Sequence, residues 1–387
     1  STVEMERHGH EHEHDEETTQ TSVSAEVIDL GVGHPGLGLL PVELVGASAR
    51  EELARGDPRI LQYGYEQGAA PFREALSAFM ERTMGVSAAP RDVFVSGGVS
   101  QALDLLCSLF TRPGDLVLAE EPTYFLALRI FEDHGLRVRS VSTDADGLIP
   151  EAVEEAVAEE QPAFLYTIPV HQNPSGVTMS AARRERVVSL AERHGFLVLA
   201  DEVYHLLTYD ETVPRPFSRY VDTGRVCALG SFSKILAPGL RMGWIHAHRD
   251  IVARIVGSGF LDSGGGLAPF TSALLTRALE DGSLEGHLRH LRSEYRRRRD
   301  ALVSALGSGD LELSRPGGGY FVWAALGEGQ SATQLLPRAR EAGVGFVPGE
   351  RFSPQGELQR YLRLSFSYYD PDRLAEGARR LLTILRP

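Results

Sequence analysis

The chain has 387 residues, of which 42% are hydrophobic and 24% are charged. These proportions are ordinary for a globular protein, and the length favours two domains because single cores stop growing beyond about 250–300 residues. The net charge of −14 argues against a nucleic-acid partner. No apolar run approaches the roughly 20 residues that span a bilayer, which argues against a membrane partner. Because no signal segment opens the sequence, we expect a cytoplasmic protein.

Residues 1–26 form a polar, acidic segment in which four histidines stand at alternate positions, namely His8, His10, His12 and His14. Dense histidine tracts can ligate divalent ions weakly. We expect a disordered, solvated tail without a metal site instead, because very few apolar residues are present to order it.

The globular sequence begins near residue 27 and alternates short apolar runs with amphipathic stretches up to about residue 245. Residues 28–33 are predicted to form a short strand that ends in a glycine-rich turn, and residues 41–54 a helix. Further strands are predicted at 93–96, 116–119, 138–142, 163–167, 197–200, 226–230 and 242–247, and helices at segments that include 100–110 and 181–194. This alternation predicts an α/β fold with a mostly parallel sheet covered by helices on both faces.

The pattern changes after about residue 285, where a long charged helix carries four consecutive arginines at 296–299. We expect that run to be a solvated helix face and not a site for a polyanion. Short strands at 316–323, 345–348 and 361–366 and a closing helix at 372–385 then predict a second, smaller α+β domain. The predicted boundaries are 45–285 for the large domain, and 27–44 with 286–387 for the small one.

The two cysteines, Cys107 and Cys227, stand in apolar surroundings. We expect buried free thiols, as in a protein of a reducing compartment.

Lys234 is the strongest candidate for a catalytic residue. Phe232 precedes it, Ile235 and Leu236 follow it, and a Pro-Gly pair turns the chain behind it, so an ordinary surface lysine is a poor interpretation. A lysine that attacks a carbonyl must be neutral, and a nearby cation such as Arg241 lowers its pKa. The surroundings of Lys234 predict a Schiff-base lysine.

Asp201 directly follows the predicted strand at 197–200, where parallel sheets bind ligands. It can keep a pyridine nitrogen protonated, or it can cap a helix. Tyr204 and Asn173 supply a phenol and an amide for a phenolate oxygen. His171 and His205 adjoin these residues, and we expect packed or solvent-facing side chains there, not a second acid–base pair.

Several groups suit a phosphate. Ser231, Ser233 and Arg241 offer hydroxyls and a guanidinium, and the glycine-rich turn at 96–101 opens a predicted helix whose amides can bind an anion. The GxGxxG spacing of dinucleotide sites is missing there. Together with Lys234 and Asp201, these groups predict pyridoxal 5'-phosphate (PLP). Tyr124 can stack on its ring, or it can be a core tyrosine.

In their order along the chain, these motifs resemble the fold-type-I aminotransferases of class I and II, from about residue 28 to the C-terminus. The similar segments are 61–68, 121–124, 172–176, 201–204, 231–234, 241–243 and 362–365. The branch that contains 2-aminoadipate and kynurenine aminotransferases is the most similar. The resemblance implies a large domain with a mostly parallel sheet, a smaller α+β domain, and a homodimer with shared active sites.

The resemblance also implies residue roles. Lys234 would form the aldimine with PLP and carry a proton, with Asp201 and Tyr204 as the other catalytic residues. The cofactor would be bound by Gly98, Val99, Ser100, Tyr124, Asn173, Asp201, Tyr204, Ser231, Ser233, Lys234 and Arg241, and Tyr63 would reach the phosphate in the neighbouring subunit. Arg363, Asn173 and the backbone around Gly33 would bind the substrate α-carboxylate.

Three departures from the family pattern stand out. Val99 and Ser100 replace a hydroxyl donor and a glutamine at the phosphate helix, and Tyr65-Glu66 replaces Pro-Thr beside Tyr63. Some members of the family read acidic substrate side chains with an arginine near the N-terminal helix, and no arginine lies between Ser24 and Ser48. That absence weakens recognition of acidic substrates by this route.

The implied function is transfer of an amino group between an L-amino acid and a 2-oxo acid. The alternative is a PLP enzyme of the same fold that catalyses another reaction, such as C–S β-elimination, decarboxylation or oxidative deamination in specialised metabolism. These enzymes share the cofactor-binding residues, so those residues do not identify the reaction. A GntR-type regulator with an aminotransferase-like domain is the third hypothesis. Only about 26 residues precede the globular sequence, too few for its DNA-binding module.

Overall fold

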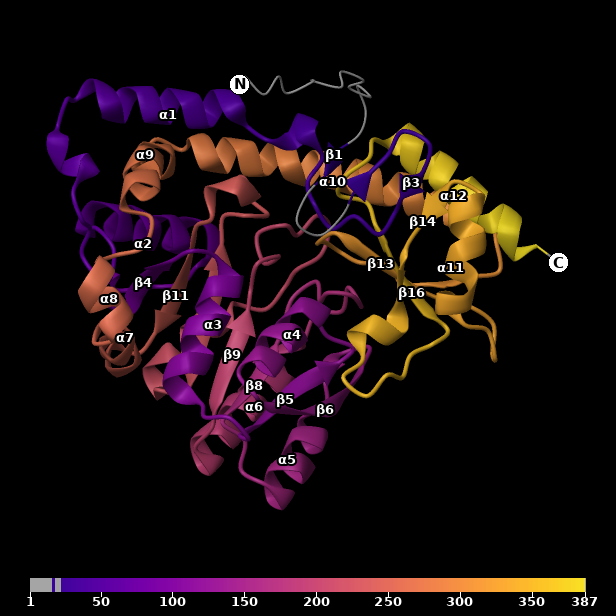
Figure 1. The fold of residues 1–387 in the computed structure, drawn as a ribbon, viewed down its shortest axis with the longest axis horizontal. Coiled ribbons are helices and arrows are strands. Elements are labelled where there is room, and N and C mark those ends of the chain that lie inside the picture. The colour runs from indigo at the N-terminus through magenta and orange to yellow at the C-terminus, as the bar shows by residue number, and fades with distance from the viewer. Residues whose placement is uncertain (1–15, 18–21, 387) are drawn as a thin grey trace, which may run out of the picture.

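The computed structural model describes residues 16–17 and 22–386, whose strands form an eight-stranded sheet, a four-stranded sheet and two two-stranded pairs (Figure 1). The strands are β1 (Glu16–Glu17), β2 (Ser22–Val23), β3 (Ile28–Asp29), β4 (Val93–Ser96), β5 (Leu116–Glu121), β6 (Arg137–Asp144), β7 (Gly147–Leu148), β8 (Phe164–Thr167), β9 (Leu197–Asp201), β10 (Val226–Ser231), β11 (Gly243–Ala247), β12 (Glu312–Leu313), β13 (Phe321–Ala325), β14 (Val344–Gly345), β15 (Val347–Pro348) and β16 (Tyr361–Ser365).

The α-helices of the described residues are α1 (Val42–Ala54), α2 (Ala70–Met84), α3 (Val99–Phe110), α4 (Phe125–Asp133), α5 (Pro150–Glu159), α6 (Ala181–His194), α7 (Arg249–Val256), α8 (Gly259–Gly264), α9 (Pro269–Glu280), α10 (Ser283–Leu306), α11 (Ala332–Glu341) and α12 (Pro371–Leu385). Short 3-10 helices are η1 (Leu37–Leu39), η2 (Pro58–Leu61), η3 (Pro90–Asp92), η4 (Phe217–Thr223), η5 (Pro238–Leu240) and η6 (Gly349–Phe352). None of these helices combines the length and the apolar character that crossing a bilayer requires.

The large sheet has the strand order β4-β11-β10-β9-β8-β5-β6-β7. The pairs from β10 through β9, β8 and β5 to β6 are parallel, whereas β11 is antiparallel to both β10 and β4. Every residue of β4, β8 and β10 is buried, as expected for strands covered on both faces. The predicted α/β fold with a mostly parallel sheet is confirmed.

Helices bury both faces of this sheet. On one face, α3 and α4 contribute Leu103 and Phe131 to a core shared with the strands, and on the other face α5 and α6 contribute Val153 and Val187 to a second core. Because the two faces are covered, ligand access is confined to the sheet edge where the parallel strands end. Cys107 is buried in the first core as a free thiol.

The four-stranded sheet has the order β12-β13-β16-β15 and is antiparallel throughout. Helices α10, α11 and α12 lie beside it, coloured orange to yellow in Figure 1. Strand β3 pairs in parallel with β14, so the start of the globular sequence joins the C-terminal third of the chain. This arrangement agrees with the predicted small α+β unit, while its boundaries at residues 44/45 and 285/286 stay a prediction.

The predicted tail of residues 1–26 is described only at 16–17 and 22–26. In this part, β1 pairs antiparallel with β2, and the carbonyl oxygens of Ala25 and Glu26 accept hydrogen bonds from arginines of α12. The four alternating histidines, His8 to His14, lie outside the described residues.

The arginine run on α10 differs from the expectation of a solvated face. Arg298 and Arg299 are both 8% exposed. Arg298 donates to the carbonyl oxygens of Ser367 and Tyr368, whereas Arg299 pairs with Asp210. The helical repeat places two of the four arginines toward the protein, where their planar groups bind carbonyl and carboxylate oxygens.

Candidate active site

The predicted site residues meet where β8, β9 and β10 end. These parallel strands end at Thr167, Asp201 and Ser231, and parallel strands place their carboxyl ends at one edge of the sheet. Lys234 follows β10 by three residues, and its Nζ donates to the carbonyl oxygen of Gly33 at 3.1 Å. The N-terminal glycine-rich turn therefore lies against the lysine.

The amine of Lys234 has an unusual pKa for a lysine. Burial, followed by the charge of Arg363, lowers the pKa to about 8, while Asp201 opposes the change. The Nζ atom lies 5.2 Å from the centroid of the Tyr320 ring. Close to pH 8, a large fraction of this amine is neutral, which is the form that a nucleophile or a base requires.

Asp201 carries a buried oxygen with no hydrogen-bond partner. Its Oδ2 accepts a bond from the hydroxyl of Tyr166 at 2.6 Å, whereas Oδ1 has no partner among the described residues. Burial raises the pKa of Asp201 to about 6, although Tyr166 and Lys234 both act to lower it. A buried, unpartnered carboxylate oxygen is costly, and a cationic N–H group of a ligand would satisfy it.

Arg363, on β16, is a buried guanidinium with no ion-pair partner among the described residues. It donates to Asn173 Oδ1 at 3.0 Å and to the carbonyl oxygen of Gly31 at 2.9 Å, while its Nε has no partner. The guanidinium carbon lies 4.0 Å from the centroid of the Phe321 ring. Burial is the main reason that the pKa of Arg363 falls to about 10. The side chain is 5% exposed, so a carboxylate ligand would find a positive charge that little water screens.

The loop that carries Asn173 is fixed by two residues to which the sequence pattern had assigned no role. Gln172 donates from Nε2 to the carbonyl oxygen of Pro122 at 2.6 Å and accepts from the backbone N–H of Ser175 at 2.9 Å. Glu120, 2% exposed, accepts from the backbone N–H of Ile168 at 2.8 Å. Glu120 is the next-to-last residue of β5 and the first of two acidic residues that end an apolar run, which was the available signal.

Tyr204 is buried among aromatic rings, with its ring centroid 5.3 Å from that of Tyr320 and 5.9 Å from that of Phe321. Burial raises the pKa of Tyr204 well above its ordinary value, so its hydroxyl stays protonated and can donate. Tyr320, which sequence reasoning missed, contacts Tyr295 through their hydroxyls at 3.1 Å. A tyrosine after three glycines was its only local signal.

The structure also brings the predicted phosphate-binding residues together. Gly98 precedes α3 with φ 101° and no side-chain cap, and Arg241 donates to the carbonyl oxygen of Gly97 at 3.3 Å. Ser231 pairs in register with Gly243, and a Cβ at position 243 would lie 3.1 Å from the Cα of Gly98, so the two glycines approach closely. The Oγ of Ser231 accepts from the backbone N–H of Ser233. The first amides of α3, those of Val99 and Ser100, have no helical acceptor and can bind an anion.

Tyr124 and Tyr63 occupy different environments. Tyr124 is half-buried at the start of α4 and affects the pKa values of Tyr204 and Arg363, so it lies near the site. Tyr63 is 80% exposed, so its side chain lies largely in solvent in a single chain. His171 and His205 are both buried, in agreement with the expectation of packed side chains.

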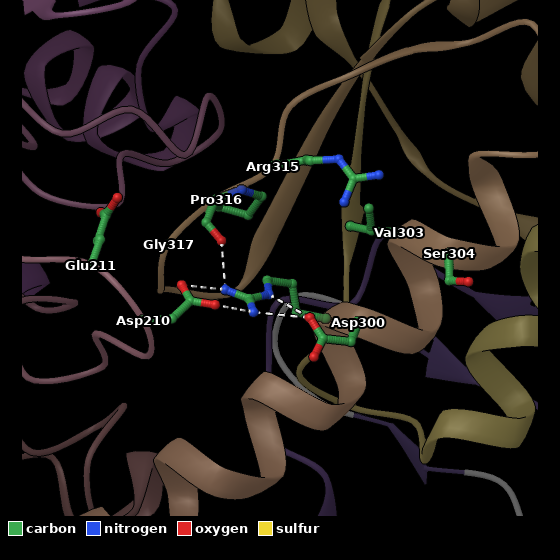
Figure 2. Close-up of a pocket in the computed structure, with 9 residues that line it drawn as sticks. Asp210, Glu211, Asp300, Val303, Ser304, Arg315, Pro316 and Gly317 are labelled. Atoms are coloured by element: carbon green, nitrogen blue, oxygen red, sulfur yellow. Dashed lines mark hydrogen bonds and ion pairs between the residues drawn. The ribbon is translucent and has the colours of Figure 1, made fainter.

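A separate pocket lies beside this site and shares no residue with it. Figure 2 shows this cavity of about 560 Å³, which lies between α10 and two loops. It is lined by Asp210, Glu211, Arg299, Asp300, Val303, Ser304, Arg315, Pro316 and Gly317. Arg299 connects the segments that line this cavity, because its guanidinium donates to Asp210 at 2.9 and 2.5 Å and to the carbonyl oxygen of Pro316 at 3.0 Å.

The family model for class I and II aminotransferases matches residues 25–381. The chain belongs to this family. This aminotransferase is 33% identical to aromatic-amino-acid aminotransferase 1 of Thermococcus litoralis, over 94% of this chain and 89% of that one. The predicted family, the fold class and an enzyme that transfers amino groups are thereby confirmed.

Solved structures of related enzymes agree. The aminotransferase superposes on kynurenine aminotransferase of Pyrococcus horikoshii, solved with PMP, with a TM-score of 0.88 at 32% identity, covering 94% of this chain and 91% of that one. Its TM-score to the α-aminoadipate aminotransferase of Thermus thermophilus, complexed with N-(5'-phosphopyridoxyl)-L-leucine, is 0.84 at 33% identity, covering 93% and 92%.

Proposed function

We propose that this aminotransferase uses PLP to move an amino group between an L-amino acid and a 2-oxo acid, at the site formed by Lys234, Asp201 and Arg363. One observation carries the proposal. A lysine with a lowered pKa lies close enough to be influenced by both a buried carboxylate that has an unpartnered oxygen and a buried guanidinium that has no ion pair among the described residues. The carboxylate suits a protonated pyridine nitrogen, the lysine supplies the amine, and the guanidinium suits an α-carboxylate.

The donor set fits PLP. Asp201 Oδ1 would take the ring N–H, and Asn173 with Tyr204 would hold the ring oxygen. The uncapped start of α3, with Gly98, Val99 and Ser100, would hold the phosphate together with Ser231, Ser233 and Arg241. A Cβ at Gly98 would lie 3.0 Å from Arg241 Nη2, so glycine keeps the phosphate-binding groove open. Tyr124 would cover one face of the ring.

When bound, PLP supplies a carbonyl that takes up the amino group and a ring that withdraws electrons from the substrate α-carbon. The chain's own residues bind the substrate and move the proton. Arg363 binds the α-carboxylate in a fixed orientation, because Asn173 and the Gly31 carbonyl hold its guanidinium. Lys234, with its pKa near 8, takes the proton from the α-carbon of the amino acid and, in the second half-reaction, delivers a proton to the α-carbon that comes from the 2-oxo acid. Asp201 stays anionic above about pH 6.

We infer that the enzyme acts as a homodimer in the cytoplasm, with Tyr63 acting in the site of the other subunit. Large exposed apolar side chains gather on the N-terminal segments and on α8 and α9, and they are Leu37, Val42, Leu53, Leu61, Tyr63, Tyr65, Phe260 and Phe270. The segments at Gly64 and Gly266 are hydrogen-bonded to each other, so part of this surface is continuous. Monomers rarely expose apolar patches of this kind.

A single-turnover experiment tests the proposed reaction. The PLP-loaded enzyme is mixed with an L-amino acid and no oxo acid, and the released 2-oxo acid and ammonia are measured. We expect one oxo acid per subunit, no ammonia, and further release only after an oxo acid is added. Continuous release of ammonia would instead identify a lyase or an oxidative deaminase. Lys234→Ala should abolish the reaction, and retained turnover would remove Lys234 from its role.

A further inference from the structure

Arg351 is an exposed guanidinium beside the active site that no described residue neutralises. It lies in η6 (Gly349–Phe352), and its guanidinium carbon is 4.3 Å from the centroid of the Phe125 ring. It makes neither an ion pair nor a hydrogen bond with any residue that the structure describes. The neighbouring acid Glu350 accepts a bond from Thr333 at 2.6 Å and Glu121 accepts one from Ser353, so both acids have other partners.

An aromatic pair connects Arg351 to Arg363. The rings of Phe125 and Phe352 meet edge to face at 5.3 Å, and the Arg363 guanidinium lies 5.1 Å from the Phe352 ring. The backbone N–H of Thr123 donates to the carbonyl oxygen of Phe352 at 2.9 Å, which fixes η6 against the turn before Tyr124. The two guanidiniums therefore flank one apolar surface at the rim of the site.

The electrostatics agree with this arrangement. Burial is the main cause of the lowered pKa of Arg363, and the positive charge of Arg351 lowers that pKa further. Two like charges that influence each other across an apolar surface are complementary to a ligand with an anion at each end and methylene groups between them. Residues 24–48 contain neither arginine nor lysine, so that segment supplies no permanently charged side chain for a distal anion.

We propose that Arg351 is a specificity-determining residue that binds the distal carboxylate of dicarboxylic amino acids and 2-oxo acids, while Arg363 binds their α-carboxylate. The inference rests on the proposed function and names its substrate class. Phe125 and Phe352 line the path between the two carboxylates and contact the methylene groups. Because the cation–π contact with Phe125 orients Arg351 without neutralising it, the guanidinium keeps its donors for the substrate.

The test compares two acceptors of equal length with one fixed amino donor. The probes are 2-oxoglutarate and 2-oxopentanoate, which differ in the distal carboxylate. For Arg351→Gln we expect kcat/KM for 2-oxoglutarate to fall roughly 10- to 100-fold, the range of a lost charged hydrogen bond. The value for 2-oxopentanoate should change by less than about threefold, because the α-carboxylate contact remains. Arg351→Lys, which keeps the charge but loses the fork, should lie between wild type and Arg351→Gln for 2-oxoglutarate.

Arg219→Gln is the matched control. Like Arg351, Arg219 is exposed, lies close to an aromatic ring (5.2 Å from that of Tyr220) and has no ion pair among the described residues. Unlike Arg351, it lies on η4, which packs on β10 and α6. Its substitution should leave both kcat/KM values unchanged. Three outcomes would overturn the inference: in Arg351→Gln, kcat/KM falls equally for both probes; kcat/KM falls for neither probe; or the wild type does not prefer 2-oxoglutarate. A wild type that aminates neither probe would contradict the proposed function itself.

Discussion

Tyr166→Phe removes one oxygen atom from the centre of the site and tests whether Tyr166 maintains the ionised state of Asp201. The Tyr166 hydroxyl donates to Asp201 Oδ2 at 2.6 Å, and the Tyr166 side chain is completely buried. Hydrogen bonds to charged groups contribute about 1.5–3 kcal/mol. The variant therefore removes the hydrogen bond that does most to keep the pKa of Asp201 low, and the backbone N–H of Val203 remains as a weaker influence in the same direction.

The direction of the pH effect follows from the bond. A donor to the carboxylate favours its charged form, so loss of Tyr166 raises the pKa of Asp201 above its value of about 6. Asp201 then loses its charge at a higher pH. We expect the acidic limb of the pH profile of kcat/KM to move upward, and kcat/KM at pH 7.5 to fall roughly 10- to 100-fold.

The assay is the pH dependence of kcat/KM between pH 5 and pH 9, with the thermal midpoint of each variant measured in parallel. Tyr220→Phe serves as the control, because it removes the same atom from a half-buried tyrosine on η4. An acidic limb that stays in place in Tyr166→Phe, with kcat/KM within threefold of wild type, would refute the role of Tyr166.

Four further predictions concern single residues. Arg363→Gln should raise KM for the amino acid roughly 10- to 100-fold without changing cofactor affinity, and an unchanged KM in steady-state kinetics would exclude the carboxylate role. Gly98→Ala should weaken PLP binding at least fivefold in an equilibrium titration, because φ is 101° and the new Cβ would lie 3.0 Å from Arg241 Nη2; equal affinity would contradict a phosphate site there. Asp201→Asn should stabilise the cofactor-free protein by up to about 3 kcal/mol at pH 8. Burial raises the pKa of Asp201 from 3.8 to about 6, so the wild-type protein loses stability as the pH rises through that range. Denaturant titrations should show the gain at pH 8 and not at pH 4, and an equal gain at both pH values would contradict the prediction. Tyr63→Ala should lower activity more than tenfold while the thermal midpoint stays within about 2 °C, since Tyr63 is 80% exposed in one chain; full activity would exclude its role in the other subunit.

The sequence by itself determined the elements and most of the chemistry. Apolar runs of strand length predicted the large sheet. Asp201 directly follows such a run, and Lys234 and Asn173 stand a few residues beyond one. Local order along the chain is sufficient for this inference, because parallel strands place whatever follows them at one edge. The small unit was predicted in the same way, including its link to residue 28.

Only the tertiary structure decided which distant groups meet. Arg363 and the Gly31 carbonyl are 332 positions apart, and no local pattern encodes their contact. Tyr166 reaches Asp201 because β8 lies beside β9, and Arg351 becomes a candidate substrate ligand because η6 packs beside Phe125. Arg299 is buried because the fold brings Asp210 to it. Contacts of this kind depend on strand order and on the side of an element that each residue occupies, and both are fixed by packing between remote segments.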